Sequence, residues 1–211
     1  MDLQPNALCQ LADVKALIDP KLSGSADNLL IQMINGISQA IEGETQRLLE
    51  KKTYTEFFNG EDGCKRLVIV QAPPIVDDET LTVYDDTTMA YTVDTKLVKN
   101  VDYFIPNAGQ SGIIKLTNDY FFKAGYKNIK VVYNGGLVKQ LTNEMNNIDV
   151  PSDLRHACAL QVSYLYKIRD NVGLQSLTTN TAGTAVFYTT PTRWLPAVKD
   201  IIESYRHFLM T

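Results

Sequence analysis

The sequence predicts an α+β protein with a mostly helical core, a small antiparallel β insertion, and a C-terminal arm and helix. Apolar residues recur every three to four positions near both ends of the chain, whereas residues 53–136 consist of short β-rich runs separated by turn residues. Residues 173–190 are dominated by Thr, Ser, Asn, Gly and Ala, as in a linker. With 211 residues there is room for one domain and an appendage. We therefore expect a first domain at 1–172 and an extended arm with an amphipathic helix at 173–211.

Two helices are expected before the β-rich block. The first is short, at about residues 10–18, and the second is long, at about residues 25–49, with Asp27 among its capping candidates. Gly36 and Gly43 lie inside the long helix, where each costs about 1 kcal/mol relative to Ala. Close packing against a neighbour is one reason for a helix to keep such glycines.

The β-rich block predicts a small antiparallel sheet or sandwich. Turn residues such as Asn134-Gly135-Gly136 separate its runs. Aromatic residues on the expected strands are predicted to fill a core or an interface: Tyr54, Phe57, Tyr84, Tyr103 and Tyr133. The expected strands are residues 53–58, 66–71, 80–84, 101–105, 112–116 and 128–133.

Two further helices follow the block. The first, at residues 152–170, is apolar over most of its circumference, which indicates burial on more than one side; a subunit contact is one way to cover the second side. The last, at residues 191–209, has one apolar stripe on a tethered helix, a pattern typical of a segment that docks on a partner. The stripe consists of Trp194, Val198, Ile201, Ile202, Tyr205, Phe208 and Leu209.

The composition argues against several classes of function. The chain is 45% hydrophobic and 21% charged, and it has no apolar run long enough to span a membrane. The first residues resemble no secretory signal, so synthesis in the cytoplasm is expected. A net charge of −4 argues against tight binding of nucleic acid through its phosphates. Three widely separated cysteines, Cys9, Cys64 and Cys158, indicate reduced and mostly buried thiols.

No catalytic, cofactor-binding or metal-binding residues are predicted. The only histidines, His156 and His207, belong to no metal or nucleophile motif, and a partly buried or interfacial role is expected for them. The acidic clusters Asp77-Asp78-Glu79 and Asp85-Asp86 flank one expected strand and are typical of solvated turns. An alternative from a different class stays open: a small metal-dependent hydrolase or ligand-binding domain using these carboxylates.

Taken in order, several segments resemble those of the head-tail connector, or adaptor, proteins of tailed phages. Residues 12–18 and 25–49 resemble the short first and long second helices of the family. The resemblance covers about residues 8–170, and the β region between Thr80 and Lys127 is longer than the family leads us to expect. The remaining segments that carry it are Thr53 to Gly60, Gln71-Ala72-Pro73-Pro74, Val131 to Gly136, Val150 to Leu154 and Tyr164 to Arg169.

The resemblance implies a non-enzymatic virion protein at the head-tail interface, made in the host cytoplasm. It implies a closed, typically dodecameric homo-oligomeric ring beneath the portal protein that extends the DNA channel without sequence-specific binding and offers its other face to a downstream neck, stopper or tail protein. The apolar stripe of residues 191–209 is then expected to contact the portal or a neighbouring subunit. Another neck or tail protein, such as a stopper or completion protein, is the alternative, although stoppers tend to be mostly β.

Overall fold

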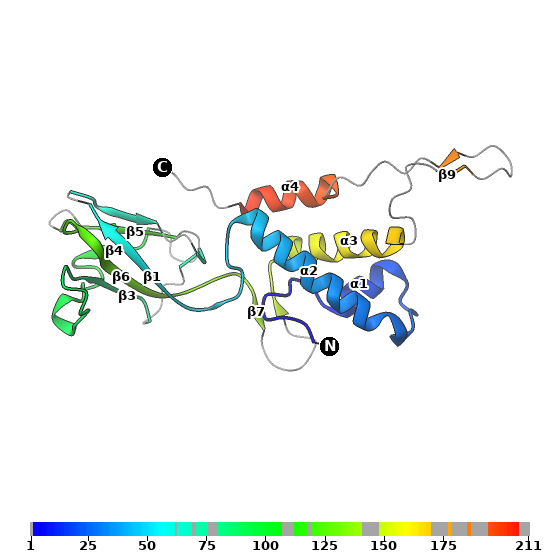
Figure 1. Ribbon diagram of the computed structural model, residues 1–211, viewed down its shortest axis with the longest axis horizontal. Helices are drawn as coiled ribbons and strands as arrows, with labels where there is room; N and C mark the ends of the chain where they lie inside the picture. The colour runs from blue at the N-terminus through cyan, green and yellow to red at the C-terminus, as the bar shows by residue number, and fades with distance from the viewer. Residues whose placement is uncertain are drawn as a thin grey trace. The chain divides into compact units, whose positions relative to one another are not determined.

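In the computed structural model the chain forms two compact units (Figure 1). The helical unit combines Met1–Thr45 with Gln140–Arg206, and the β unit is built on Gln46–Lys139. None of the helices in the described part of the chain is both long and apolar enough to cross a membrane. The structure describes residues 2–61, 63–68, 71–75, 80–106, 112–117, 120–140, 148–169, 177–178, 185–186 and 194–206.

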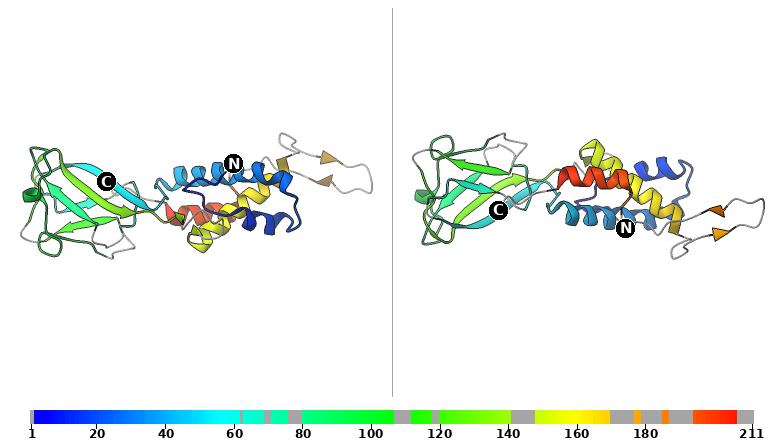
Figure 2. Two further views of the ribbon diagram at one scale, coloured as in Figure 1. Left: turned by 90° about the horizontal axis from the view of Figure 1, so that it is seen from below. Right: turned by 90° about the horizontal axis from the view of Figure 1, so that it is seen from above.

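The helical unit is built on four α-helices, which Figure 2 shows from two further sides. Helix α3 packs against α1, α2 and α4, and α2 also contacts α1 and α4. The helices are α1 (Leu11–Ile18), α2 (Asp27–Thr45), α3 (Ser152–Ile168) and α4 (Pro196–Tyr205), with a short 3-10 turn η1 (Gly24–Ala26) before α2. Four two-residue strands complete the elements outside the β unit's sheets: β7 (Lys139–Gln140), β8 (Ile148–Asp149), β9 (Leu177–Thr178) and β10 (Ala185–Val186).

The helices expected at residues 10–18 and 152–170 are confirmed as α1 and α3, with residue 170 outside the described residues, but the expected end of the second helix was wrong. Helix α2 stops at Thr45 because Gln46 has a φ of 54°, in the left-handed region that interrupts a right-handed helix. Thr45 is buried, and its hydroxyl donates to the carbonyl oxygen of Ile41 one turn earlier at 2.9 Å, so this buried polar side chain has a partner.

The last helix is shorter than the expected range of residues 191–209. Helix α4 begins at Pro196, a residue suited to the first helical turn because its fixed φ fits the helix and its missing N–H has no partner there anyway. The helix ends at Tyr205. Residues 191–193 and 207–209 lie outside the described residues.

Helix α3 is buried on several sides within the helical unit, as the apolar residues around its circumference predicted. Leu154, Ala157, Cys158 and Val162 of α3 are all buried. Within the described residues, helices α1, α2 and α4 of the same chain supply that cover, so no subunit contact is needed to explain it. Arg155 of α3 donates two hydrogen bonds of 2.7 Å to the carboxylate of Asp13 in α1, a bidentate geometry that fixes the two helices in register.

The β unit contains two three-stranded antiparallel sheets, with strand orders β1-β6-β3 and β2-β5-β4. Each of the six expected strands is confirmed, with shifted ends; residues 69 and 70 of the second one lie outside the described residues. The strands are β1 (Lys52–Gly60), β2 (Arg66–Val68), β3 (Thr82–Asp85), β4 (Tyr103–Phe104), β5 (Ile113–Leu116) and β6 (Gly125–Gly135), and a 3-10 turn η2 (Val93–Thr95) follows β3.

Both sheets contribute to one core. Tyr54, Val83 and Val131 come from the first sheet, and Tyr103 and Ile114 come from the second. After β6 the chain turns at Gly136, whose φ of 98° is a conformation that glycine adopts without strain. The expected turn role is confirmed at Gly136, whereas Asn134 and Gly135 belong to strand β6 and pair with Thr53 and Lys52 of β1.

The expectation of a mostly helical core with a small β insertion was wrong in its proportions. The fold is α+β, but the β-rich segment forms a second compact unit with its own core rather than a decoration of the helical one. The reason is that the six runs form two sheets, and two sheets facing one another bury enough apolar side chains to make a core. The division of the chain into a domain at 1–172 and an appendage at 173–211 stays a prediction.

Candidate functional site

The acidic pair Asp85-Asp86 at the end of β3 is buried, so its expected place in a solvated turn was wrong, and it is held by hydrogen bonds from the protein itself. The carboxylate of Asp85 is buried and accepts hydrogen bonds from the Tyr120 hydroxyl (3.1 Å), the backbone N–H of Lys123 (3.0 Å) and the side-chain amide of Asn128 (3.0 Å). Such a set of donors stabilises a carboxylate and leaves it a structural role.

Asp86 organises the loop that follows. Its carboxylate accepts hydrogen bonds from the Thr88 hydroxyl (2.6 Å), the Thr88 N–H (2.8 Å) and the Tyr91 N–H (2.7 Å). These bonds, led by the one from the Thr88 hydroxyl, lower the pKa of Asp86. Asp77 and Asp78, the other half of the possible metal site, lie outside the described residues. Among those that are described, His, Cys, Asp and Glu form no group of three or more able to hold a metal ion.

The buried thiols form a pair that sequence spacing did not indicate. Cys9 and Cys158 are both buried and free, with their sulfur atoms 3.5 Å apart, whereas Cys64 is partly exposed. The hydrogen bond with Cys158, together with burial, raises the pKa of Cys9 well above its usual value. The expectation of reduced and mostly buried thiols is confirmed for this pair. His156 is exposed on α3, and His207 lies outside the described residues.

The expected contact stripe begins just before α4 and continues along it, and three of its five described residues are in the core. Trp194, Val198 and Ile202 are buried in the helical unit, where the N–H of Leu195 also donates to the Gln161 side chain at 3.0 Å. Ile201 and Tyr205 are half-buried, and the Tyr205 hydroxyl donates to Asp153 at 2.7 Å. Phe208 and Leu209 lie outside the described residues. The contact role of the stripe stays a prediction.

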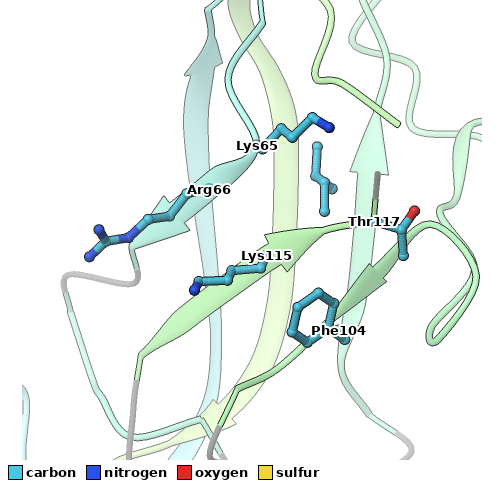
Figure 3. Close-up of a pocket in the computed structure, with 6 residues that line it drawn as sticks. Lys65, Arg66, Phe104, Lys115 and Thr117 are labelled. Atoms are coloured by element: carbon cyan, nitrogen blue, oxygen red, sulfur yellow. The ribbon is translucent and has the colours of Figure 1, made fainter. Parts of the chain in front are cut away.

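A basic hollow lies at the sheet β2-β5-β4. It has a volume of about 540 Å³ and is lined by Lys65, Arg66, Phe104, Lys115, Leu116 and Thr117. Figure 3 shows Arg66 and Lys115 extending toward the same side of neighbouring strands, with the Phe104 ring beside Lys115. We call this feature the basic hollow.

The sheet register accounts for the basic hollow. Lys115 is paired with Arg66 on one side and with Phe104 on the other, so two cations and an aromatic ring share one row across the outer face. Paired residues in antiparallel strands have Cβ atoms about 5 Å apart. Lys65 precedes Arg66 along the chain and lies outside this row; its ammonium group is 4.1 Å from the centre of the Phe121 ring, a cation–π contact.

Sequence analysis missed the basic hollow because its residues come from three separate segments. The one signal available was alternation: in the run Ile113–Leu116, Ile114 and Leu116 are buried while Lys115 is exposed, so Lys115 marks the outward face. No local pattern shows that Arg66 and Phe104 are its neighbours on either side.

The outer face of the other sheet carries an aromatic group around Lys130. The ammonium group of Lys130 lies 5.5 Å from the Tyr84 ring and 5.2 Å from the Tyr91 ring, and Phe57 is its partner on β1. Phe57 is 47% exposed, so of its two expected places, a core or an interface, it does not occupy the core. Alternation along the strand puts Phe57 on the opposite face from Tyr54 and Glu56.

No protein-family model and no curated protein matches the chain. Three solved structures contain a chain of similar fold, each 15% identical and each matched over 100% of this chain. One lies in the neck of an empty gene transfer agent particle computed with C6 symmetry, with a TM-score of 0.56 over 95% of that chain. Another lies in the neck of the native particle computed with C12 symmetry, with a TM-score of 0.55 over 94%.

The third similar chain lies in the virion of the native gene transfer agent particle, with a TM-score of 0.58 over 95% of that chain. In all three the likeness spans both units of the present chain, since the whole chain is covered. At this level of identity the comparison shows a shared fold.

Proposed function

We propose that the protein is a non-enzymatic structural subunit of the neck of a tailed phage or phage-like particle, where copies of the chain form a ring. The observation that carries the proposal is the likeness of fold over the full chain to chains in the neck of a gene transfer agent particle. An entire two-unit arrangement of helices and strands is shared with these neck chains, which makes the likeness more informative than a match to one common motif.

The proposed assembly is a homo-oligomeric ring, in its finer form a dodecamer beneath the portal protein. One of the similar structures was computed with C6 symmetry and another with C12 symmetry. A ring of twelve equivalent subunits is compatible with both symmetries. Closed rings arise when one surface of a subunit binds a different surface of the next and the rotation closes. The ring extends the DNA channel without reading its sequence and offers its far side to a downstream stopper or tail protein. This role requires no cofactor, metal ion or membrane, and it locates the protein in the virion after synthesis in the host cytoplasm.

The stripe on α4 is proposed to contribute to subunit or portal contacts through its outer residues. Removing residues 191–211 would not test this, because it deletes Trp194, Val198 and Ile202 from the core of the helical unit. A sharper pair of variants is Ile201→Ser, at a half-buried position, and a truncation after Arg206 that removes Phe208 and Leu209. Weaker portal binding in folded variants is the expected result. A portal affinity unchanged in both would contradict the contact role.

The proposed function is tested by size-exclusion chromatography with light scattering on the purified chain, alone and mixed with the portal protein from the same genome. A ring-sized species, or co-elution with the portal, is the expected result. A monomer that ignores the portal but binds another neck protein would assign the chain to a different level of the neck, such as a stopper. A monomer that binds neither would overturn the neck assignment.

A further inference from the structure

We propose that Cys9 and Cys158 form an intrachain disulfide bond once the protein leaves a reducing compartment. Their sulfur atoms are 3.5 Å apart, and both side chains are completely buried in the helical unit. The bond itself is a property of one chain. As a biological role it rests on the proposed function, since a neck protein made in the reducing cytoplasm of a host passes with the released particle into oxidising surroundings.

The bond requires only a small approach of the two sulfur atoms. A disulfide bond is about 2.05 Å long, so the separation has to shrink by about 1.5 Å. Cys158 lies within helix α3, whereas Cys9 lies in the segment before α1, outside any helix or strand. Because the backbone of such a segment is not fixed by helical hydrogen bonds, Cys9 is the partner that moves to close the gap.

Neighbouring contacts hold the two thiols together. After Cys9 in the chain, Asp13 of α1 accepts the two hydrogen bonds of 2.7 Å from Arg155 of α3. Before it, the N–H of Leu8 donates to the hydroxyl of Ser38 in α2 at 3.0 Å, and this hydroxyl lies 3.7 Å from the sulfur on α3. Contacts on both sides of Cys9 therefore give the two thiols a higher effective concentration than two cysteines on an unfolded chain have.

The cross-link joins the two halves of a unit that is discontinuous in sequence. The helical unit combines Met1–Thr45 with Gln140–Arg206, and residues 46–139 lie between these halves in the chain. Cys9 belongs to the first half and Cys158 to the second, so a bond between them closes a loop that spans 149 positions. A disulfide stabilises a fold mainly because it restricts the unfolded chain, and the effect grows with the length of the loop.

The chemical step is a thiol–disulfide exchange, with a small-molecule disulfide such as oxidised glutathione as the oxidant. One protein thiolate attacks a sulfur of the oxidant and releases a small thiolate, which leaves a mixed disulfide. The second protein thiolate attacks the protein sulfur of that mixed disulfide and releases the other small thiolate. The protein loses two protons and two electrons in the two steps, and the oxidant is reduced to two thiols.

The surroundings of the pair keep it reduced until conditions favour oxidation. The hydrogen bond with Cys158, followed by burial, raises the pKa of Cys9 well above its usual value. Because the thiolate is the attacking form, the exchange is slow at neutral pH and becomes faster as pH rises.

The test uses the full chain with Cys64→Ser, which removes the one thiol outside the pair. The chain is incubated with oxidised glutathione at about pH 8.5, near the pKa of a free cysteine, and its thiols are then counted in denaturant. We expect the count to fall from two to zero, and peptide mapping should find Cys9 joined to Cys158. The matched control is Cys9→Ala/Cys64→Ser, which keeps one thiol of the pair and has no partner for an internal bond.

Stability provides the second measurement. Trp194 is buried in the helical unit, so its fluorescence follows the urea unfolding of that unit. The oxidised chain should have a higher urea midpoint than the reduced chain, and dithiothreitol should restore the lower value. The midpoint of the control should not depend on oxidation and reduction in this way.

A second route removes the barrier that burial places before the oxidant: the chain is refolded from urea in a buffer of reduced and oxidised glutathione. Absence of the Cys9–Cys158 bond by both routes would overturn the inference. Mixed disulfides with glutathione at both positions in place of the internal bond would do the same, because they would show that the two sulfur atoms do not reach each other. A bond that forms but lowers the urea midpoint would also overturn it, since the folded unit would then be strained by the link.

The outcome is separable from that of the neck proposal. The disulfide bond is measured on the chain by itself, whereas ring formation is measured by light scattering with the portal protein. A chain that joins the portal but does not form the bond would overturn only the disulfide. A chain that forms the bond but binds neither the portal nor another neck protein would overturn only the neck assignment.

Discussion

Asn128 is the residue that joins the ends of three segments of the β unit. It is fully buried, its side-chain oxygen accepts from the Gly60 N–H at 2.7 Å, and its side-chain amide donates to Asp85 and to the Lys123 carbonyl oxygen at 3.0 and 2.8 Å. A buried amide is tolerated when it is hydrogen-bonded in this way. Gly60 is required beside it, because a Cβ there would lie 1.9 Å from the carbonyl oxygen of Lys123.

We predict that Asn128→Ala destabilises the β unit by about 2–4 kcal/mol, since it removes three hydrogen bonds and leaves the Asp85 carboxylate and two backbone groups with fewer partners. Urea unfolding followed by tyrosine circular dichroism measures the change. Asn59→Ala is the control, because Asn59 is exposed and accepts one hydrogen bond, from the Lys127 N–H at 2.9 Å. Its expected cost is below about 1 kcal/mol. Equal losses in the two variants would contradict the assignment of Asn128 as a buried junction.

The buried tyrosines predict that the β unit loses stability at alkaline pH. Burial raises the pKa of Tyr103 from 10.0 to about 12, and burial followed by the hydrogen bond to Glu56 raises the pKa of Tyr133. A group whose pKa is higher in the folded state gives its full stabilisation below the unfolded pKa and loses it as pH rises through the folded one. For Tyr103 the loss therefore falls between about pH 10 and pH 12.

Denaturation midpoints at a series of pH values measure this effect. Tyr103→Phe should reduce the alkaline loss, because the variant has no phenol to ionise, at the expense of the 3.4 Å hydrogen bond to the Leu81 carbonyl oxygen at neutral pH. Tyr126→Phe is the control, since Tyr126 is 68% exposed and should leave the pH dependence unchanged. An alkaline loss of the same size in Tyr103→Phe and the unaltered chain would show that other groups cause it.

At the residue scale, sequence reasoning succeeded where the signal is local and failed where it is distant. Alternation along the strands predicted a core or an interface for five aromatic residues; Tyr54, Tyr103 and Tyr133 are in the core, whereas Phe57 is exposed. The Cys9–Cys158 contact joins residues 149 positions apart, and no spacing rule indicates it. The basic hollow was missed for the same reason, because strand order and register decide which charges meet.

At the scale of elements, helix α2 carries two glycines that its own chain does not explain. A Cβ added at Gly36 or Gly43 meets nothing within 4 Å, and both positions are exposed. Close packing was expected to account for these glycines, but among the described residues no contact requires either of them. Seven residues apart, the two lie on nearly the same face of the helix.

We predict that Gly36→Ala and Gly43→Ala each stabilise the helical unit by about 0.5–1 kcal/mol, because alanine has the higher helix propensity and restricts the unfolded chain. Thermal unfolding followed by circular dichroism measures the gain. Gly136→Ala is the contrasting variant: its φ of 98° and a Cβ 2.3 Å from the Glu50 carbonyl oxygen make it destabilising. A lower stability of the isolated chain with alanine at position 36 or 43 would contradict the observation that a Cβ there meets no atom within 4 Å.

Elements were easier to predict from the sequence than their ends or their proportions. Among the described residues, periodicity of 3.6 and of 2 identified the four α-helices and the strands of the two larger sheets, since each period arises from the local backbone. The end of α2 depends on the left-handed backbone conformation of Gln46, and a glutamine does not predict that conformation from the sequence. The size of the β unit depended on two sheets meeting, which is a tertiary event.

The whole molecule has two separate cores, and this has a thermodynamic consequence. The core of the β unit comprises residues between Tyr54 and Tyr133, whereas the buried residues of the helical unit come from segments before Gln46 and after Lys139. Each unit closes its own backbone hydrogen bonds in helices or sheets. Units of this kind unfold as separate cooperative blocks unless a large apolar interface couples them.

We therefore predict two unfolding transitions, and the chain carries a reporter for each. Its single tryptophan, Trp194, is buried in the helical unit, so tryptophan fluorescence follows that unit. Tyrosine circular dichroism is dominated by the β unit, whose core holds Tyr54, Tyr103 and Tyr133. In urea the two signals should have different midpoints, and Asn128→Ala should shift the tyrosine transition while Gly36→Ala shifts the tryptophan transition. Coincident midpoints that move together in both variants would mean that the units fold as one block. Separate midpoints would mean that neither core depends on the other, so in the proposed ring one unit could be held in fixed contacts while the other adjusts.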